Sequence, residues 1–210
     1  HTNTTGGNNT AVGYRSLYLN TTASNLVAVG YQALSNNTTG GSGVAVGYNA
    51  LENNTLGSGN TAVGRQALQQ NTTATSNTAV GYLALADNTT GTRNVALGAS
   101  AGQNITTGGD NVAIGGNVLN DLTTGSRNVG VGDQVLYNTT GNDNVAMGDR
   151  AGHLNTSGVY LTAIGTEAGY NNTTANYTTA IGRKALHANT TGDYNTAVVG
   201  DALTSNTTGQ

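Results

Sequence analysis

Residues 60–76 read NTAVGRQALQQNTTATS, and variants of these 17 residues recur along the whole chain. The recurrence is clearest at the aliphatic residue before the first Gly, which is Val63 in this stretch. Successive equivalents lie 17 residues apart, except for one step of 16 from Val131 to Met147. The equivalents are Val12, Val29, Val46, Val63, Val80, Leu97, Ile114, Val131, Met147, Ile164, Ile181 and Val198. A fixed internal period of this kind is typical of a repeat protein.

We therefore treat residues 1–210 as a single repeat array, with a partial coil at 1–8. Complete coils begin near residues 9, 26, 43, 60, 77, 94, 111, 128, 144, 161, 178 and 195. The residue missing from the 16-residue step falls in a turn, because Leu136-Tyr137-Asn138-Thr139 is one shorter than Leu34-Ser35-Asn36-Asn37-Thr38. Turns tolerate deletions better than strands do, so the short step is consistent with the period.

Each coil contains two short segments with β-forming composition, such as 61–63 and 66–68, and Gly or Asn-rich turns follow both. No helical period is present, and helical repeats need about 30 or more residues per unit. The pattern predicts an all-β fold, a parallel β-solenoid (β-roll) of twelve 17-residue coils.

The composition also favours repetition over an ordinary globular core. The chain has 32 Gly, no Pro, Cys, Trp or Phe, and only 8% charged residues. A compact core needs larger side chains, whereas disorder usually comes with high net charge and few β-branched residues. With a net charge of −3 and many Val and Thr, the chain is expected to fold around a thin core.

Several functional classes find no support in the sequence. The seven Lys and Arg are scattered, whereas nucleic-acid binding needs clustered cations, and no apolar run approaches the roughly 20 residues of a membrane span. Three dispersed histidines, His1, His153 and His187, and the absence of Cys give no metal-ligand pattern. No Ser-His-Asp or paired-carboxylate arrangement can be assigned. We expect no enzyme activity, cofactor, metal site, nucleic-acid partner or membrane insertion.

The strand segments are apolar on both sides. In Val95-Ala96-Leu97 the side chains alternate, so Val and Leu point one way and Ala points the other. We predict that the aliphatic row from Val12 to Val198 forms the structural core ladder inside the coil. The Ala side then needs a cover, and the sequence offers no helix or second domain for it. A second copy of the chain is the economical cover, which predicts a homo-oligomer packed along the rod axis.

Three segments carry a resemblance to a known family. Asn94–Gly98, Asn111–Gly115 and Thr162–Gly165 resemble the Asn-Ser-Val-Ala-Ile-Gly repeats of trimeric autotransporter adhesin heads of the YadA and haemagglutinin type. Asn60–Leu68 is similar to repeat arrays of phage tail-fibre-like and bacterial surface proteins. The resemblance covers essentially the whole chain. It implies a left-handed β-roll, a homotrimer, exposure on a cell or virion surface, and a role in attachment.

Tyr14, Tyr31, Tyr48 and Tyr82 occupy one place in the coil, directly after the corner Gly. Other coils have Arg65 or Ala99 there, which indicates an exposed position. Two interpretations stand side by side. The four rings stiffen the rod by stacking, or they form a surface-binding ladder for a host-surface glycan or protein receptor.

The Asn-Thr-Thr-Gly turns carry two further hypotheses. Sequons at Asn37, Asn71, Asn88 and Asn189 make N-glycosylation a candidate modification. A Thr ladder could also order water as an ice-binding face, but adjacent Thr in an extended segment are expected to point to opposite sides and leave one exposed rank. The first Thr of the turn is assigned to Thr21, Thr38, Thr55, Thr72, Thr89, Thr106, Thr123, Thr139, Thr156, Thr173, Thr190 and Thr207.

The function that the sequence favours is a structural and adhesive extracellular fibre module. Two alternatives stay open. One is a subunit of an end-to-end filament, because Thr2–Gly6 and Asn206–Gly209 stand in nearly the same phase of the coil. The other is a monomeric Thr-ladder solenoid that binds ice or a glycan. Because the chain starts at His1 and not Met, we expect a processed product or a piece of a longer protein.

Overall fold

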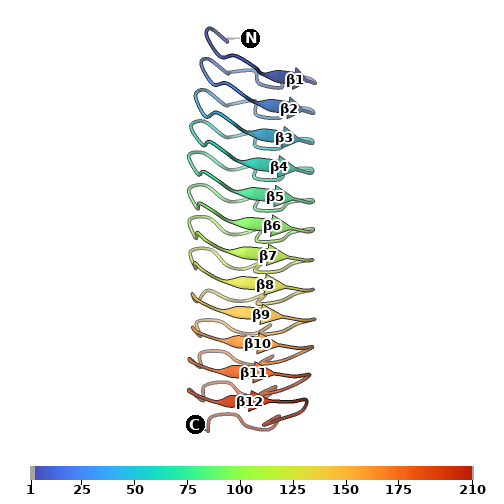
Figure 1. The fold of residues 1–210 in the computed structure, drawn as a ribbon, viewed down its shortest axis with the longest axis vertical. Helices are drawn as coiled ribbons and strands as arrows, with labels where there is room; N and C mark the ends of the chain where they lie inside the picture. The colour runs from blue at the N-terminus through green and yellow to red at the C-terminus, as the bar shows by residue number, and fades with distance from the viewer. Residues whose placement is uncertain (1–2, 210) are drawn as a thin grey trace.

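The computed structural model describes residues 3–209, which form a rod of stacked coils with the two ends of the chain at opposite ends of the rod (Figure 1). The prediction of an all-β parallel β-solenoid is confirmed: twelve strands form one sheet in the order β1 to β12. At the usual spacing of about 4.8 Å, this sheet is about 53 Å long. The strands are β1 (Thr10–Val12), β2 (Val27–Val29), β3 (Val44–Val46), β4 (Thr61–Val63), β5 (Thr78–Val80), β6 (Val95–Leu97), β7 (Val112–Ile114), β8 (Val129–Val131), β9 (Val145–Met147), β10 (Thr162–Ile164), β11 (Thr179–Ile181) and β12 (Thr196–Val198).

Equivalent residues of neighbouring coils pair in register, so that Ala96 faces Ala113 and Leu97 faces Ile114. The 16-residue step keeps this register, because Val131 still pairs with Met147. In-register pairing turns each place in the coil into a row of side chains along the rod. A row of like or complementary residues stabilises the stack, and a mismatched residue disturbs both neighbours.

The turn absorbs the deletion, but not as the sequence suggested. Thr139 is buried in the place that Asn155 occupies in the following coil, and the Asn155 side-chain amide donates to its hydroxyl at 3.1 Å. Thr140 takes the first Thr place, and its hydroxyl donates to the Thr156 carbonyl at 2.9 Å. The assignment of Thr139 to the first Thr place is therefore wrong. The deleted residue is the exposed second Thr of the turn. Deletion of a buried residue would instead leave a void in the core.

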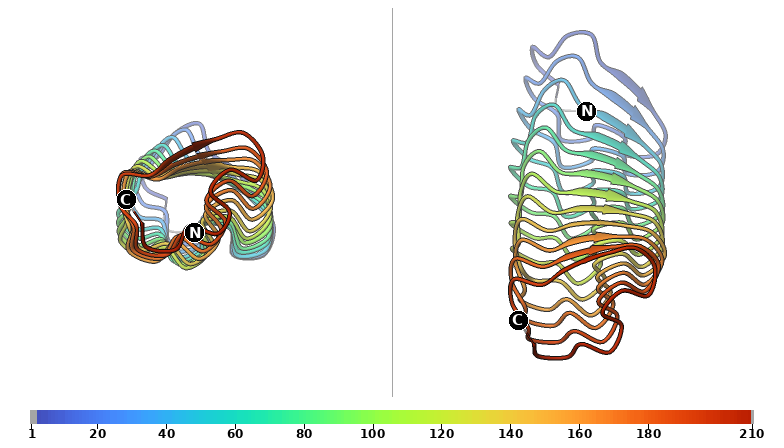
Figure 2. Two further views of the ribbon diagram at one scale, coloured as in Figure 1. Left: turned by 90° about the horizontal axis from the view of Figure 1, so that it is seen from below. Right: turned by 60° about the horizontal axis from the view of Figure 1, so that its bottom comes forward.

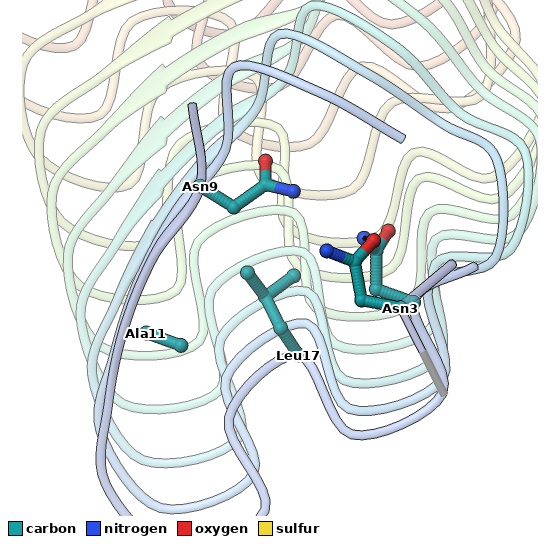
Figure 3. Close-up of a pocket in the computed structure, with 5 residues that line it drawn as sticks. Asn3, Asn9, Ala11 and Leu17 are labelled. Carbon is teal, nitrogen blue, oxygen red and sulfur yellow. Dashed lines mark hydrogen bonds between the residues drawn. The ribbon is translucent and has the colours of Figure 1, made fainter. Parts of the chain in front are cut away.

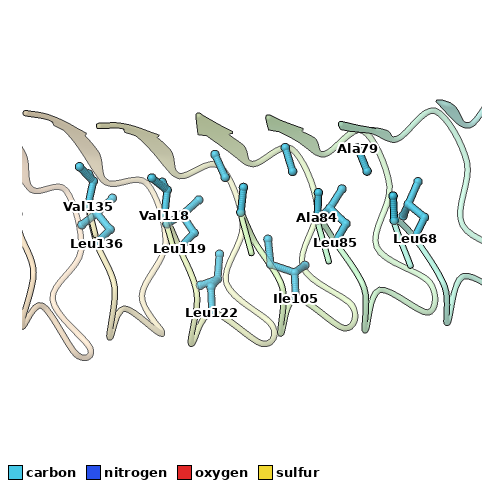
Figure 4. Packing of buried hydrophobic residues seen from close by; sticks show 14 of the residues in the cluster. Leu68, Ala79, Ala84, Leu85, Ile105, Val118, Leu119, Leu122, Val135 and Leu136 are labelled. Atoms are coloured by element: carbon cyan, nitrogen blue, oxygen red, sulfur yellow. The ribbon is translucent and has the colours of Figure 1, made fainter. Parts of the chain in front are cut away.

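The interior is built mainly from Ala and Leu. From β2 onward the middle Ala of the strands points inward and is buried, as at Ala62 and Ala79, whereas Ala11 of β1 is exposed at the end of the rod. Ala67 and Leu68 of the following segment are equally buried and pack against it, and Figure 4 shows such pairs repeating from coil to coil. One strand has Gly130 in place of Ala, because a Cβ there would lie 2.5 Å from the Val118 side chain.

The predicted core ladder is wrong about its side of the strand. The row Val12, Val29, Val46, Val63, Val80, Leu97, Ile114, Val131, Met147, Ile164, Ile181 and Val198 lies on the outer face of the sheet, with Leu97 48% and Met147 49% exposed. The inside of a 17-residue coil is narrow, so the sheet turns its small Ala inward and its larger aliphatic residues outward. The Ala row is covered by the chain itself, and the side that lacks a cover is the aliphatic side.

The second predicted β segment is also wrong, because the coil has one strand only. In the segment 66–68, Gln66 and Leu68 have φ values of 59° and 51°, in the left-handed region. Leu17, Leu34, Leu51 and Leu85 repeat this conformation at 48–50°. The alternation of left-handed residues folds the segment into a turn that directs each Leu into the core. A left-handed Leu costs roughly 1–2 kcal/mol, which burial of its side chain offsets.

A ladder of buried Asn side chains runs through the interior. The Asn71 amide nitrogen donates to the Asn54 side-chain oxygen at 2.6 Å and to the Ala74 carbonyl at 3.2 Å, and Asn88 donates to Asn71 at 3.1 Å. A second buried row includes Asn60 and Asn77. Here the backbone N–H of Asn77 donates to the side-chain oxygen of Asn60 in the preceding coil at 3.0 Å. The sequence pattern indicated turn residues here, whereas the side chains are core members that tie successive coils together.

Candidate functional site

The largest repeated surface is the outer face of the twelve strands, which we call the strand face. It consists of the outer aliphatic row and a parallel row of Thr or Val two residues earlier in each strand. This second row is Thr10, Val27, Val44, Thr61, Thr78, Val95, Val112, Val129, Val145, Thr162, Thr179 and Thr196. Viewed along the rod, the strands make up one side of the coil (Figure 2). The two rows contain no charged side chain along about 53 Å of sheet.

Three of the four predicted ladder tyrosines stack directly. The ring centroids lie 5.2 Å apart between Tyr14 and Tyr31 and 5.1 Å apart between Tyr31 and Tyr48. Arg65 continues the row, with its guanidinium 5.8 Å from the Tyr48 ring centre and 5.5 Å from that of Tyr82. The predicted exposure is confirmed, since the four side chains are 42–60% exposed.

Stacking decides which parts of these rings can reach a ligand. Sugars bind aromatic side chains through the ring faces, but a face-to-face row covers the faces and leaves ring edges and hydroxyls in solvent. The Arg65 guanidinium lies over one face of Tyr48, whose other face meets Tyr31. The geometry therefore favours the stiffening role of the tyrosine row over a glycan-binding role.

A second surface row was not identified from the sequence. Arg93, Asp110, Arg127 and Asp143 occupy the corner place two residues before the strand, and the Arg93–Asp110 and Arg127–Asp143 ion pairs are both 2.6 Å long. The next three coils have Tyr160, Tyr177 and Tyr194 there, stacked at 4.8 and 5.1 Å. In the sequence, this row could have been recognised from the opposite charges that alternate at the repeat spacing. These ion pairs and stacked rings join equivalent places of neighbouring coils and so support the in-register stacking.

These ion pairs make a pH-dependent contribution to stability. The pKa of Asp110 lies below its ordinary value of 3.8, chiefly because Arg93 donates hydrogen bonds to the carboxylate, and Arg127 lowers the pKa of Asp143 in the same way. A lowered folded-state pKa means that the folded state binds the proton less readily than the unfolded state. The stabilisation is therefore present above the unfolded pKa and is lost as the pH falls through the folded pKa.

We expect the denaturation midpoint of the wild type to fall as the pH decreases from about 7 to about 3. The double substitution Asp110→Asn and Asp143→Asn should make this decrease shallower, because neither side chain can then lose a charge. Asp87→Asn is the control, since Asp87 is exposed and forms no ion pair within residues 3–209. Urea denaturation at several pH values tests this, and parallel curves for the double variant and the wild type would contradict it.

One further group of charged side chains gathers around Glu167. Glu167 lies 2.8 Å from Arg150, 3.5 Å from Lys184 and 3.6 Å from His187. His153 and His187 occupy the same place two coils apart, with Tyr170 stacked between them. Among the described residues no group of three His, Cys, Asp or Glu could hold a metal ion, and His1 lies outside them.

The turns differ from expectation in two ways. Both Thr residues of a turn lie on the outside, as Thr89 and Thr90 do, because the interior places on either side belong to Asn88 and Gly91. In most turns the second Thr is exposed and the first is partly buried, so the most exposed rank is a single one as expected, but neither Thr points into the core as strict alternation would require. The sequon residues Asn37, Asn71, Asn88 and Asn189 are at most 1% exposed, and their amide nitrogens bond inside the core. A glycan cannot be attached to them in the folded stack.

A pocket of about 280 Å³ lies at the N-terminal end of the rod, lined by Asn3, Asn9, Ala11, Leu17 and Asn20 (Figure 3). Within the stack the same places are covered by the neighbouring coil, as at Asn37 and Leu34. The pocket is thus the open end of the core and has no side chains that the other coils lack.

Comparisons with family models, with curated proteins and with solved structures find no match to this chain. The described part of the chain contains no helix able to span a lipid bilayer. Function therefore has to be argued from the repeated surfaces themselves.

Proposed function

We propose that the chain is a structural shaft module of an extracellular fibre, in which several copies pack their strand faces together along a common axis. The observation that carries this proposal is the outer aliphatic row. In the single chain no member of this row is buried, Leu97 and Met147 are about half exposed, and no polar residue interrupts the row over twelve strands. A cell or virion surface is the setting that the adhesin-like repeats imply, and three is the copy number that they imply.

The size of the strand face supports a partner. A sheet about 53 Å long and about 10 Å wide has a plan area of roughly 500 Å². Soluble monomers seldom leave contiguous apolar patches larger than a few hundred Å². A stable interface needs about 800 Å² of accessible surface from each partner, which two bulky rows and their flanks can approach.

A second copy is the partner that fits this surface best. The rows repeat at the spacing of the strands, so a ligand that covers all of them must be long and have the same period. Another copy of the chain has the same length and the same period. Closed symmetric assemblies of identical chains are also the commonest oligomers. The tyrosine and Arg–Asp rows lie at other places in the coil and stay available to stiffen the shaft or to meet a surface partner.

The proposal predicts that one charge on the strand face dissociates the assembly. Leu97→Glu puts a carboxylate in the middle of the outer row, where it would be buried between copies at a cost of several kcal/mol. In the single chain the side chain is 48% exposed, so the fold should tolerate the change. Sedimentation should give an oligomer for the wild type and 21.0 kDa for the variant.

Ala99→Glu is the matched control, because Ala99 is exposed in the same coil but lies beyond the corner at Gly98. It should leave the mass of the assembly unchanged, and circular dichroism should show the same fold for both variants. An oligomer that survives Leu97→Glu would exclude the strand face as the contact.

A further inference from the structure

The second Thr of the turn is nearly uniform along the rod, although it is exposed. We call this row the outer Thr rank. It consists of Thr5, Thr22, Thr39, Leu56, Thr73, Thr90, Thr107, Thr124, Ser157, Thr174, Thr191 and Thr208, so only two members depart from Thr. The coil with Thr139 and Thr140 has no member, because its turn lacks this residue.

The fold explains the neighbouring inner Thr rank but not the outer one. Inner-rank hydroxyls donate to the carbonyl of the next coil, as from Thr72 to Thr89 and from Thr89 to Thr106, both at 3.1 Å. Outer-rank hydroxyls make no hydrogen bond within residues 3–209. Their uniformity is therefore not needed to hold one coil on the next.

Common descent of the coils does not explain the outer Thr rank either, because other exposed places have diverged. The exposed place of Tyr48 is Arg65 in the next coil and Ala99 two coils further on. The exposed place two residues before the strand changes from Ser76 to Arg93 and later to Tyr160. Against this variation, a row that stays Thr while fully available to solvent points to a ligand.

The geometry restricts what that ligand can be. The two ranks run side by side, and in-register stacking repeats them at about 4.8 Å along the rod. The inner rank is held in one orientation by its hydrogen bonds, so binding loses little side-chain entropy. Neither rank contains a charged or aromatic residue. A ligand that contacts the ten Thr of the outer rank together must itself be periodic and extended.

We propose that the two Thr ranks form a face that binds ice. Thr presents a hydroxyl that hydrogen-bonds to water and a methyl group that limits competing hydration. A rigid lattice of such groups can hold water in the ordered arrangement of a crystal surface. A crystalline polysaccharide is the other periodic solid to consider, but its recognition relies on aromatic ring faces, which both ranks lack.

The Thr face and the strand face are independent of each other. Between Thr39 and β3 the chain turns a corner at Ser42, whose φ is 56°, and the two surfaces therefore lie on different sides of the coil. Copies joined through their strand faces would keep their Thr ranks in solvent. Failure of one proposal leaves the other standing, because ice affinity and solution mass are measured separately.

The test uses the purified chain in thermal-hysteresis and ice-recrystallisation assays. The wild type should separate the freezing and melting points and should keep ice crystals small. Thr107→Lys should reduce thermal hysteresis several-fold, because a long charged side chain in the outer rank holds the ice surface away. Ala99→Lys is the matched control, since it adds the same charge to an exposed place of the same coil outside both ranks.

Two results would overturn the proposal. One is a wild type without thermal hysteresis and without inhibition of recrystallisation, whether or not it binds cellulose or chitin. The other is equal activity in Thr107→Lys and the wild type, with circular dichroism showing both folded. Activity that is lost in Thr107→Lys and kept in Ala99→Lys supports an ice-binding Thr face.

Discussion

Replacing Gly81 by Ala is expected to divide the rod between its fifth and sixth coils. Gly81 has a φ of 140°, and a Cβ at this residue would lie 2.4 Å from the carbonyl oxygen of Gly98 in the next coil. The obstacle is backbone, which cannot rotate away as a side chain can. The stacked coils would have to move apart, and both the strand pairing of β5 with β6 and the Gly98 amide bond to Val80 would be lost.

The expected loss is several kcal/mol, because it combines backbone strain with broken hydrogen bonds between two coils. Coils contact only their neighbours, so the parts on either side should become independent units. Urea denaturation should change from one transition to two. Hydrogen exchange should show lost protection in β5 and β6 and retained protection in β2 and β9.

Gly59→Ala separates strain from steric conflict. Gly59 has a φ of 67°, but its nearest neighbour to an added Cβ is 3.9 Å away. This variant should cost roughly 1–2 kcal/mol for the left-handed conformation alone and should keep a single transition. If Gly81→Ala proved no more harmful than Gly59→Ala, the close approach of corner glycines would not control stacking.

The second large effect is expected for Asn71→Ala. Its side chain accepts from Asn88 and donates to Asn54 and to the Ala74 carbonyl, all of them buried. Truncation leaves the Asn54 oxygen without its donor and opens a small void. A buried polar group without a partner costs about 1–3 kcal/mol, and the void adds to this, so we expect a total loss of about 3 kcal/mol.

Gln70→Ala is the control, because Gln70 is an exposed residue next to Asn71 whose side-chain oxygen accepts an exposed hydrogen bond from Asn53. We expect its stability to stay within about 0.5 kcal/mol of the wild type. Denaturation by urea measures both variants. Similar midpoints for Asn71→Ala and Gln70→Ala would mean that the interior amide ladder contributes little.

The period and the register could be predicted because they depend only on which residues recur. Seventeen-residue spacing determined the twelve strands and placed Val131 opposite Met147 despite the deletion. The side of the strand could not be predicted in the same way. Val95 and Leu97 are apolar and so is Ala96, and alternation alone does not say which set is inside. The width of the coil decides it, and that width comes from the left-handed Leu turns, which β-like composition concealed.

The surfaces were predictable only in part. Variation at the place of Tyr14 correctly indicated exposure, since residues as different as Arg65 and Ala99 replace it. The outward direction of both Thr ranks was missed because the turn was treated as an extended strand of period two. Its interior places in fact recur every three residues, as at Asn88, Gly91 and Asn94. The buried Asn ladder was missed for the same reason.

The central claim is that sister chains cover the outer aliphatic row, and the mass of the unmodified chain in solution tests it most directly. Sedimentation equilibrium over a wide concentration range should give a constant multiple of 21.0 kDa, and three copies is the multiple that the adhesin-like repeats imply. A mass of 21.0 kDa at every concentration would contradict the claim, because the strand face would then be stable in water without a partner.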